Sequence, residues 1–307
     1  MRKFTGKYFG QAWADLTQDK RWWQPLLILT LVSCIPIIGS ITAWGYFYDW
    51  AKEASWGLNR PFPRKVGDAG KRIKYGFFAL LISWVWVLPF SIVASLVNNI
   101  PFVGSLLYFL LTLCGLAAGA VAQAAILRAL TYERLSPGFD FKRIVGMARR
   151  DTNGLVRCWL ISFVGGLIIA AIACVVLIPS VILPMVAVTG SMGSMGDMGM
   201  QYYYNDSFSD MSYYGAELRP IVMALLGALP ILLVVGFVLS FFGTIVGALS
   251  TRAYGYWFGQ FMPNTWGRAE DPMPFERMAT PGATGAYGAY GAGQQAPYGA
   301  QGQQAPY

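Results

Sequence analysis

Histidine is absent from this sequence, and charged residues make up only 12% of its 307 positions. Without histidine the chain lacks the commonest general base, the commonest metal ligand and the usual switch near neutral pH. The four cysteines form no Cys-x-x-Cys pair, so they indicate neither a zinc site nor a disulfide framework. We therefore expect that the protein is not an enzyme and that it has no cofactor.

Charge is also missing from three long stretches, namely 75–127, 158–196 and 220–251. One crossing of a bilayer takes about 20 apolar residues, and a charged side chain is costly inside it. Hydrophobic residues make up 55% of the chain, which agrees with this interpretation. The sequence thus predicts an all-α integral membrane protein.

The positive charges that are present cluster between the apolar stretches. Lys and Arg number five in residues 1–24, seven in 49–74 and seven in 128–157, whereas 190–219 holds only Arg219. Cytoplasmic loops of membrane proteins are enriched in Lys and Arg. We therefore expect a multi-pass protein of the cell membrane with both termini in the cytoplasm and with 190–219 as an outer loop.

The first apolar run, 25–48, conflicts with a simple crossing because both of its flanks are basic. Pro36 and Gly39 interrupt this run, and the same Ile-Pro-x-x-Gly-Ser pattern returns with Pro101 and Gly104, where the second hairpin must turn back. Proline and glycine are typical of chain reversals. The preferred interpretation is a re-entrant hairpin, and a single kinked span that breaks the charge rule is the alternative.

These patterns predict four full spans, a re-entrant first hairpin and two flanking segments. Residues 1–24 place aromatic and apolar side chains at helical spacing, which is typical of an amphipathic helix at the membrane interface. The tail 263–307 is repetitive and rich in Gly, Ala, Gln and Tyr, so we expect it to be disordered. The membrane domain is expected over 25–255, with hairpins at 25–48, 75–127 and 158–250.

The order of these features resembles a family of bacterial and archaeal membrane proteins catalogued as domain of unknown function 4013. The resemblance rests on the aromatic start from Tyr8 to Trp23, the Ile-Pro-Ile-Ile-Gly turn at 35–39, the Gly45 and Tyr46 that follow, and the linker 57–63. It covers about residues 4–255. The resemblance implies an all-helical multi-pass fold and brings no established activity, substrate or catalytic residue.

Small residues recur four positions apart on three of the expected spans. Such spacing lets helix backbones approach closely in lipid. Packing within one chain is the simpler interpretation, and contact between copies in a homo-oligomer is the other. The positions concerned are Gly115 and Gly119, Gly243 and Gly247, and Ser162 and Gly166.

Polar side chains within the expected spans are few and uncharged. Gln123 is the strongest of them, and hydroxyl side chains such as Ser83, Ser240 and Thr244 accompany it. Hydroxyls in helices often bond to their own backbone, so helix packing is the expected role. The absence of ionisable residues from these spans argues against an ion-coupled transporter.

The expected outer loop is rich in methionine, and clustered thioethers can capture Cu(I). The positions are Met192, Met195, Met198 and Met200. A copper site is therefore an alternative to the expectation of no metal. Against it, the loop contains neither histidine nor cysteine, and no span continues the methionine pattern inward.

The expected partners follow from where the charges and repeats lie. The basic linkers 60–74 and 142–157 adjoin apolar spans, so anionic lipid headgroups of the inner leaflet are expected there and nucleic acid is not. Tyrosines of the tail could make weak multivalent contacts with cytoplasmic proteins.

The favoured function is a non-enzymatic packing or scaffold protein with a sticky tail. The alternative is a transporter or permease-like protein for an uncharged or lipid-like substrate.

Overall fold

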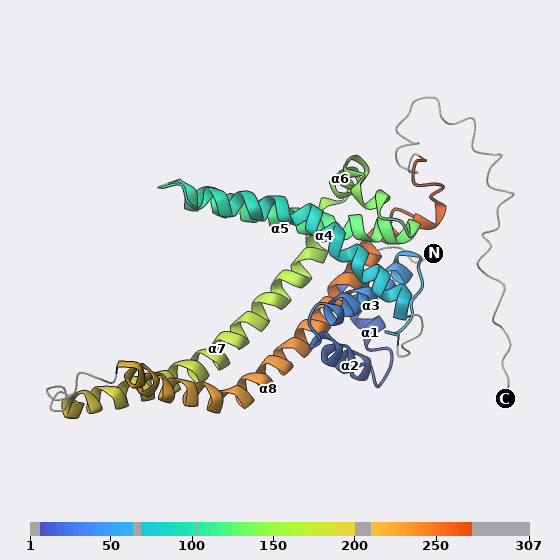
Figure 1. The fold of residues 1–307 in the computed structure, drawn as a ribbon. Helices are drawn as coiled ribbons and strands as arrows, with labels where there is room; N and C mark the ends of the chain where they lie inside the picture. The colour runs from blue at the N-terminus through green and yellow to red at the C-terminus, as the bar shows by residue number, and fades with distance from the viewer. Residues whose placement is uncertain (1–6, 64–68, 102, 200–209, 272–307) are drawn as a thin grey trace, which may run out of the picture.

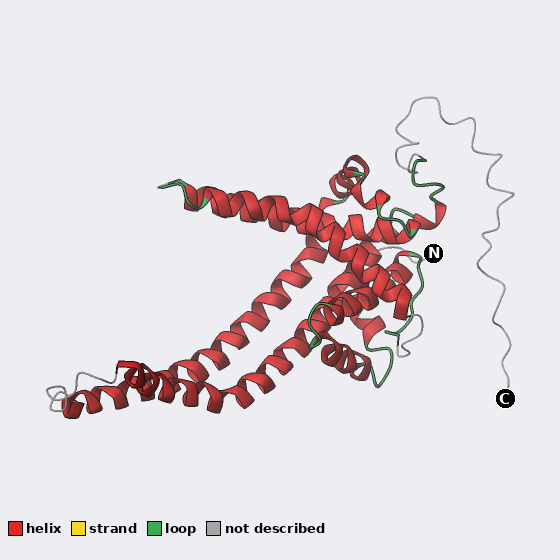
Figure 2. Ribbon diagram, in the orientation of Figure 1, coloured by secondary structure: helices red, strands yellow, loops and turns green. Residues whose placement is uncertain are grey.

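The computed structural model describes residues 7–63, 69–101, 103–199 and 210–271, and this part of the chain is helical without a strand (Figure 2). The helices are α1 (Tyr8–Leu16), α2 (Trp23–Ser33), α3 (Ile38–Ser55), α4 (Ala69–Val97), α5 (Gly104–Tyr132), η1 (Ser136–Phe139), α6 (Phe141–Arg150), α7 (Thr152–Gly199), α8 (Asp210–Gly259) and η2 (Pro263–Thr265).

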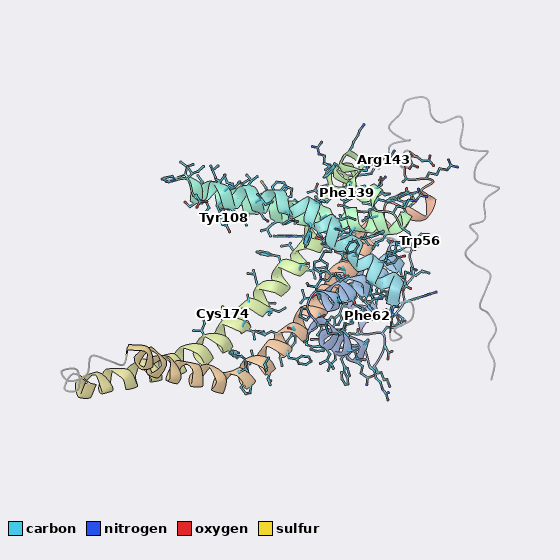
Figure 3. The ribbon with its side chains drawn as sticks, viewed as in Figure 1. Trp56, Phe62, Tyr108, Phe139, Arg143 and Cys174 are labelled. Carbon is cyan, nitrogen blue, oxygen red and sulfur yellow. The ribbon has the colours of Figure 1, made fainter. Side chains whose placement is uncertain are left out.

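Four helical segments are long and apolar enough to cross a membrane: Ala69–Val97, Gly104–Tyr132, Thr152–Val176 and Leu232–Gly259. The shortest has 25 residues, so at a rise of 1.5 Å it extends over about 38 Å, more than the hydrocarbon core of a bilayer. Large apolar side chains are exposed along these helices, among them Tyr108 of α5, and the smaller Cys174 of α7 is exposed as well (Figure 3). The predicted all-α multi-pass membrane fold is confirmed.

The long helices form two hairpins that extend from a common base (Figure 1). One hairpin pairs α4 with α5, and the other pairs α7 with α8. The shorter helices α1, α2, α3 and α6 gather where the two hairpins meet. The two hairpins therefore share the base and separate toward their far ends.

The turns of the first two hairpins repeat one geometry. Between α2 and α3, the Gly39 amide donates to the Ile35 carbonyl at 3.1 Å, and between α4 and α5 the Gly104 amide donates to the Ile100 carbonyl at 3.0 Å. Each glycine faces the backbone carbonyl seven residues before it, on Val32 or Val97, where a Cβ atom would collide. Pro36 and Pro101 lie in these turns.

The first hairpin is shorter than the others. Helix α2 has 11 residues, which extend over about 17 Å and cannot cross a bilayer alone. It folds back on α3, whose last turns carry Asp49, Lys52 and Glu53. This geometry fits the re-entrant interpretation, while the side of the membrane on which it opens stays a prediction.

Helix α3 holds the base together by close backbone contact with two neighbours. Gly45 of α3 faces the Arg72 backbone of α4, and Gly76 of α4 faces the Ile41 backbone of α3 in return. Gly255 of α8 likewise faces the backbone of Ala51, which is on α3. Small residues allow this approach, so α3 packs directly against one helix of each long hairpin.

A buried ion pair joins both ends of the described chain to α3. The Arg252 side chain is fully buried, and its Nε donates to Oδ2 of Asp15 at 2.9 Å. The same guanidinium donates to the carbonyl oxygens of Trp50 and Leu58. Tyr256 donates its hydroxyl to Asp15 as well. A buried charge is tolerated when it is paired and fully hydrogen-bonded, which is the case here.

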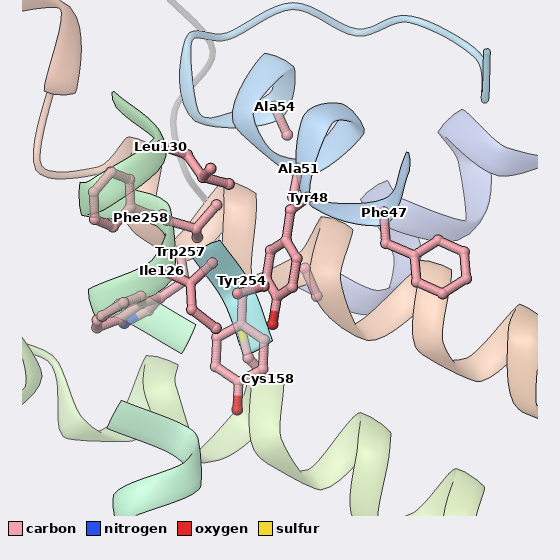
Figure 4. Packing of buried hydrophobic residues seen from close by; sticks show 14 of the residues in the cluster. Phe47, Tyr48, Ala51, Ala54, Ile126, Leu130, Cys158, Tyr254, Trp257 and Phe258 are labelled. Atoms are coloured by element: carbon pink, nitrogen blue, oxygen red, sulfur yellow. The ribbon is translucent and has the colours of Figure 1, made fainter. Parts of the chain in front are cut away.

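The hydrophobic core also lies in the base. Tyr48, Trp257 and Phe258 pack there with Ile126 and Leu130 (Figure 4). Helix α1 adds Tyr8, Ala12 and Leu16, which lie one turn apart and are all buried. The predicted amphipathic helix is thus shorter than 1–24, and its buried face contacts protein. Phe9 and Trp13 remain exposed on it.

Two predicted boundaries differ from the structure. Helix α7 runs to Gly199 and α8 begins at Asp210, so most of the expected outer loop 190–219 is helical, and 200–209 lies outside the described residues. Four glycines lie in the last ten residues of α7 and do not end the helix before Gly199. The second difference concerns the tail: 263–271 is ordered against α5 and α6, and the remainder of the predicted disordered tail, 272–307, lies outside the described residues.

The packed segment 263–271 closes over α5 and α6 as a strap. Trp266 stacks on Tyr132 with ring centroids 6.2 Å apart. Arg143 of α6, seen in Figure 3, donates to the backbone carbonyls of Ala269 and Glu270. Aromatic stacking and charge-assisted hydrogen bonds therefore order a segment whose composition alone indicated disorder.

The buried ion pair predicts a large effect of one substitution. Asp15→Ala leaves the Arg252 guanidinium buried without its anion, so the free energy of unfolding should fall by about 3–5 kcal/mol. Asp19→Ala, four residues further on, should cost less than about 1 kcal/mol. Unfolding in detergent, followed by circular dichroism, measures both. Equal losses would contradict the assigned role of Asp15.

Alanine substitution should change stability in opposite directions at a glycine that contacts α3 and at one that has free space beside it. Gly76→Ala places a Cβ against the Ile41 backbone, and overpacking of this kind typically costs about 1–3 kcal/mol. At Gly119 the nearest atom to an added Cβ is 3.9 Å away. Gly119→Ala should therefore be neutral or stabilise the helix by about 1 kcal/mol. Unfolding in detergent measures both variants. A Gly76→Ala variant as stable as the wild type would rule out the close approach of α3 and α4.

Candidate functional site

A cavity of about 510 Å³ lies beside the base, between the first hairpin and the two long hairpins. No charged side chain of the described residues lines it. Ten uncharged polar side chains do, and they come from α2, α3, α4, α5, α7 and α8: Ser33, Ser40, Tyr48, Ser83, Gln123, Ser162, Ser240, Thr244, Ser250 and Thr251.

The cavity lies toward the basic ends of the spans. Gln123 is five residues from Arg128, and Ser162 is five residues from Arg157, which corresponds to about 8 Å along each helix. Thr244, eight residues from Arg252, lies about 12 Å from it. If the basic ends face the cytoplasm, as the charge distribution predicts, the cavity occupies the inner half of the membrane.

Gln123 and Tyr48 form the strongest polar contact in the cavity. The Tyr48 hydroxyl donates to Oε1 of Gln123 at 2.7 Å. Tyr48 itself is buried in the core (Figure 4). Within the described residues, the amide nitrogen of Gln123 has no hydrogen-bond partner. It is therefore a donor held in a fixed position and available to a bound molecule.

The hydroxyl side chains are arranged mainly as acceptors. Ser33, Thr244 and Thr251 each donate to a backbone carbonyl of their own helix, at 2.8, 2.9 and 2.8 Å respectively. A hydroxyl that donates in this way keeps lone pairs that can accept a further hydrogen bond. Ser83 and Ser162 have no partner among the described residues. The cavity thus offers both donors and acceptors.

The structure places only some of the predicted packing residues at this cavity. Gly243, Gly247 and Ser162 line it, whereas an added Cβ at Gly166 would meet nothing within 4 Å. On α5, Gly115 faces Phe90 of α4 and Gly119 faces Val87 of α4. On α8, Gly247 faces Phe47 of α3, and an added Cβ at Gly243 would meet nothing within 4 Å, so the glycines of α5 and those of α8 have different neighbours.

Sequence reasoning singled out Gln123, Ser83, Ser240 and Thr244 but did not place them together. It overlooked Ser33, Ser40 and Tyr48 as members of the site. The residues of both groups have an uncharged polar side chain, and they lie on successive apolar helices. That signal was present in the sequence, but which faces meet depends on the packing around α3.

The charged residues form separate contacts at the base. Lys52 of α3 lies 3.2 Å from Oε1 of Glu133, and the Tyr75 hydroxyl donates to the same oxygen at 2.7 Å. The hydrogen bond from Tyr75 lowers the pKa of Glu133 below its usual range, which keeps the carboxylate charged. Arg128 pairs with Asp140 across α5 and α6. These pairs connect helices and do not face the cavity.

The described residues give no further evidence for a metal site. No group of three or more His, Cys, Asp or Glu side chains there could hold a metal ion. Met192, Met195 and Met198 fall on helix α7, and Met200 lies outside the described residues. The Cu(I) hypothesis therefore stays a prediction.

Comparison with known proteins gives one match. Residues 28–178, from α2 into α7, match the family described as Protein of unknown function (DUF4013). This is the family that the sequence resembles, so the resemblance is confirmed over these residues. No curated protein and no solved structure matches the chain.

The contact between Tyr48 and Gln123 predicts a non-additive pair of substitutions. Gln123→Leu removes the acceptor of a buried hydroxyl, which should lower the free energy of unfolding by about 1–3 kcal/mol. Adding Tyr48→Phe removes the unsatisfied donor and should restore much of that loss. Unfolding of both variants and of Tyr48→Phe alone measures the coupling. Strictly additive losses would contradict a direct hydrogen bond.

Proposed function

We propose that this multi-pass membrane protein binds an uncharged molecule bearing hydroxyl or amide groups in the cavity and lets it pass the membrane. The observation that carries the proposal is the lining itself, to which the described residues contribute ten polar side chains and no charged one. The proposal is non-enzymatic, because the described residues that line the cavity include neither a general base nor a nucleophile with an adjacent base.

The absence of charge from the lining selects the substrate class. An ion that entered the cavity would lose its hydration without meeting a counter-charge, which is costly inside a membrane. A neutral polyol or the neutral head of a lipid-like molecule would instead exchange hydrogen bonds with water for bonds to Gln123 and the serine hydroxyls. Uncharged substrates are therefore favoured over ions.

The position of the cavity supports passage as well as binding. Its lining comes from both long hairpins, α4 with α5 and α7 with α8, and these hairpins are connected through α3. A change in their relative angle about α3 would alter access to the cavity without unfolding either hairpin. Movement of packed units against each other about a fixed site is a common mode of transport.

A packing or scaffold role with a tail that binds cytoplasmic partners is the second candidate. One observation favours it: the strap 263–271 fixes the root of the tail against α5 and α6 through Trp266 and Arg143. Tail residues from 272 onward would then leave from one defined place on the base. The repeats that would bind partners lie outside the described residues.

Uptake into proteoliposomes tests the first proposal. The full chain should increase uptake of radiolabelled sorbitol, an uncharged polyol, and leave gluconate, a charged solute of similar size, at the level of empty liposomes. Ser162→Leu together with Gln123→Leu should abolish the sorbitol uptake, because two Leu side chains fill the cavity and remove two of its donors. Ser91→Leu is the matched control, since Ser91 is exposed on α4 outside the cavity.

A lipid-like substrate requires a second probe. Monoacylglycerol with a photoactivatable chain should form adducts within 240–251 in the wild type and not in the cavity-filled variant. The proposal fails if sorbitol uptake equals that of empty liposomes and no such adducts form. In that case, retention of cytoplasmic proteins by the full chain but not by a chain ending at residue 271 would favour the scaffold role.

A further inference from the structure

A second cavity, of about 450 Å³, lies between α5, α6 and α7 on another side of the base. Its lining is apolar except for Arg149 and Thr152. Thr152 donates its hydroxyl to the Ala148 carbonyl at 3.0 Å and is thereby satisfied. Among the described residues, Arg149 is the only charged one that lines the cavity.

Arg149 is a cation for which the described part of the chain supplies no paired carboxylate. It lies in the last turn of α6 and is exposed. Across the described residues, no acidic side chain pairs with it. The nearby carboxylate of Asp151 is engaged elsewhere, by the Gln260 amide at 2.8 Å and by the Gly154 backbone amide. Arg149 is therefore free to bind an anionic group from outside the chain.

The cavity extends from Arg149 along the spans. On α5 its lining runs from Val121 to Leu113, which is about 12 Å along the helix axis. On α7 it includes Leu155 and Trp159. An elongated apolar space with a cation at the basic end of the spans matches a lipid, which carries its charge at the headgroup and its apolar chain beneath.

We propose that this cavity binds one anionic phospholipid, with an acyl chain between α5 and α7 and the headgroup phosphate on Arg149. Charge complementarity identifies the occupant, because a guanidinium donates well to phosphate oxygens and the apolar lining suits a hydrocarbon chain. The lipid would bridge α5 and α7, which belong to different hairpins. The site is independent of the substrate proposed for the hydroxyl-lined cavity.

Photo-crosslinking in vesicles tests this site. The full chain is reconstituted in phosphatidylcholine containing a minor fraction of phosphatidylglycerol with a photoactivatable acyl chain. Adducts should map to 113–121 and 155–159. Lys142 is exposed on the same helix and does not line the cavity, so Lys142→Gln removes the same charge as a control. Arg149→Gln should lower the labelling about tenfold more than Lys142→Gln does.

Two further controls distinguish lipid bound in this cavity from lipid attracted to the protein surface in general. Ala117→Phe fills the cavity at an exposed position and should remove the mapped adducts while the protein stays folded. Excess glycerol phosphate, which has the headgroup chemistry but no acyl chain, should not compete. Equal labelling of the Arg149 and Lys142 variants, adducts spread evenly over exposed positions of α4, or displacement by glycerol phosphate would each overturn the proposal.

Discussion

The buried guanidinium of Arg252 connects the parts of the base that lie farthest apart in sequence. It binds Asp15 near one end of the described chain and the carbonyls of Trp50 and Leu58 at the end of α3. Because a buried charge must keep its partners, these segments cannot separate without a large cost. Together with the glycine contacts of α3, this interaction fixes the positions from which both long hairpins extend. The location of both cavities depends on that arrangement.

The membrane environment explains why the two cavities differ in chemistry. Side chains that face lipid must be apolar, and polar groups are retained where they face protein or water. One cavity gathers uncharged polar groups from six helices and suits a neutral polar molecule. The other is apolar beneath the single cation Arg149 and suits an anionic lipid. The proposed substrate site and the proposed lipid site can therefore coexist at one base.

The membrane class, the spans and the turns at Pro36 and Pro101 could be predicted from the sequence, because hydropathy and Pro-Gly patterns are local signals. It was insufficient for the contacts of α3, since Gly45 and Gly76 meet across two helices and no local pattern pairs them. It also predicted disorder from residue 263, whereas tertiary contacts of Trp266 order the strap. The cavity is a property of helix faces that meet, and composition alone does not determine it.

The most direct test of the account is whether water reaches the hydroxyl-lined cavity inside the membrane. In a background with the four native cysteines replaced, Ser162→Cys and Ser91→Cys are compared in inside-out membrane vesicles with a membrane-impermeant thiol reagent. The account predicts modification at 162, which lines the cavity, and protection at 91, which is exposed on α4 outside it. Protection of both positions would contradict a water-filled cavity at this place in the fold.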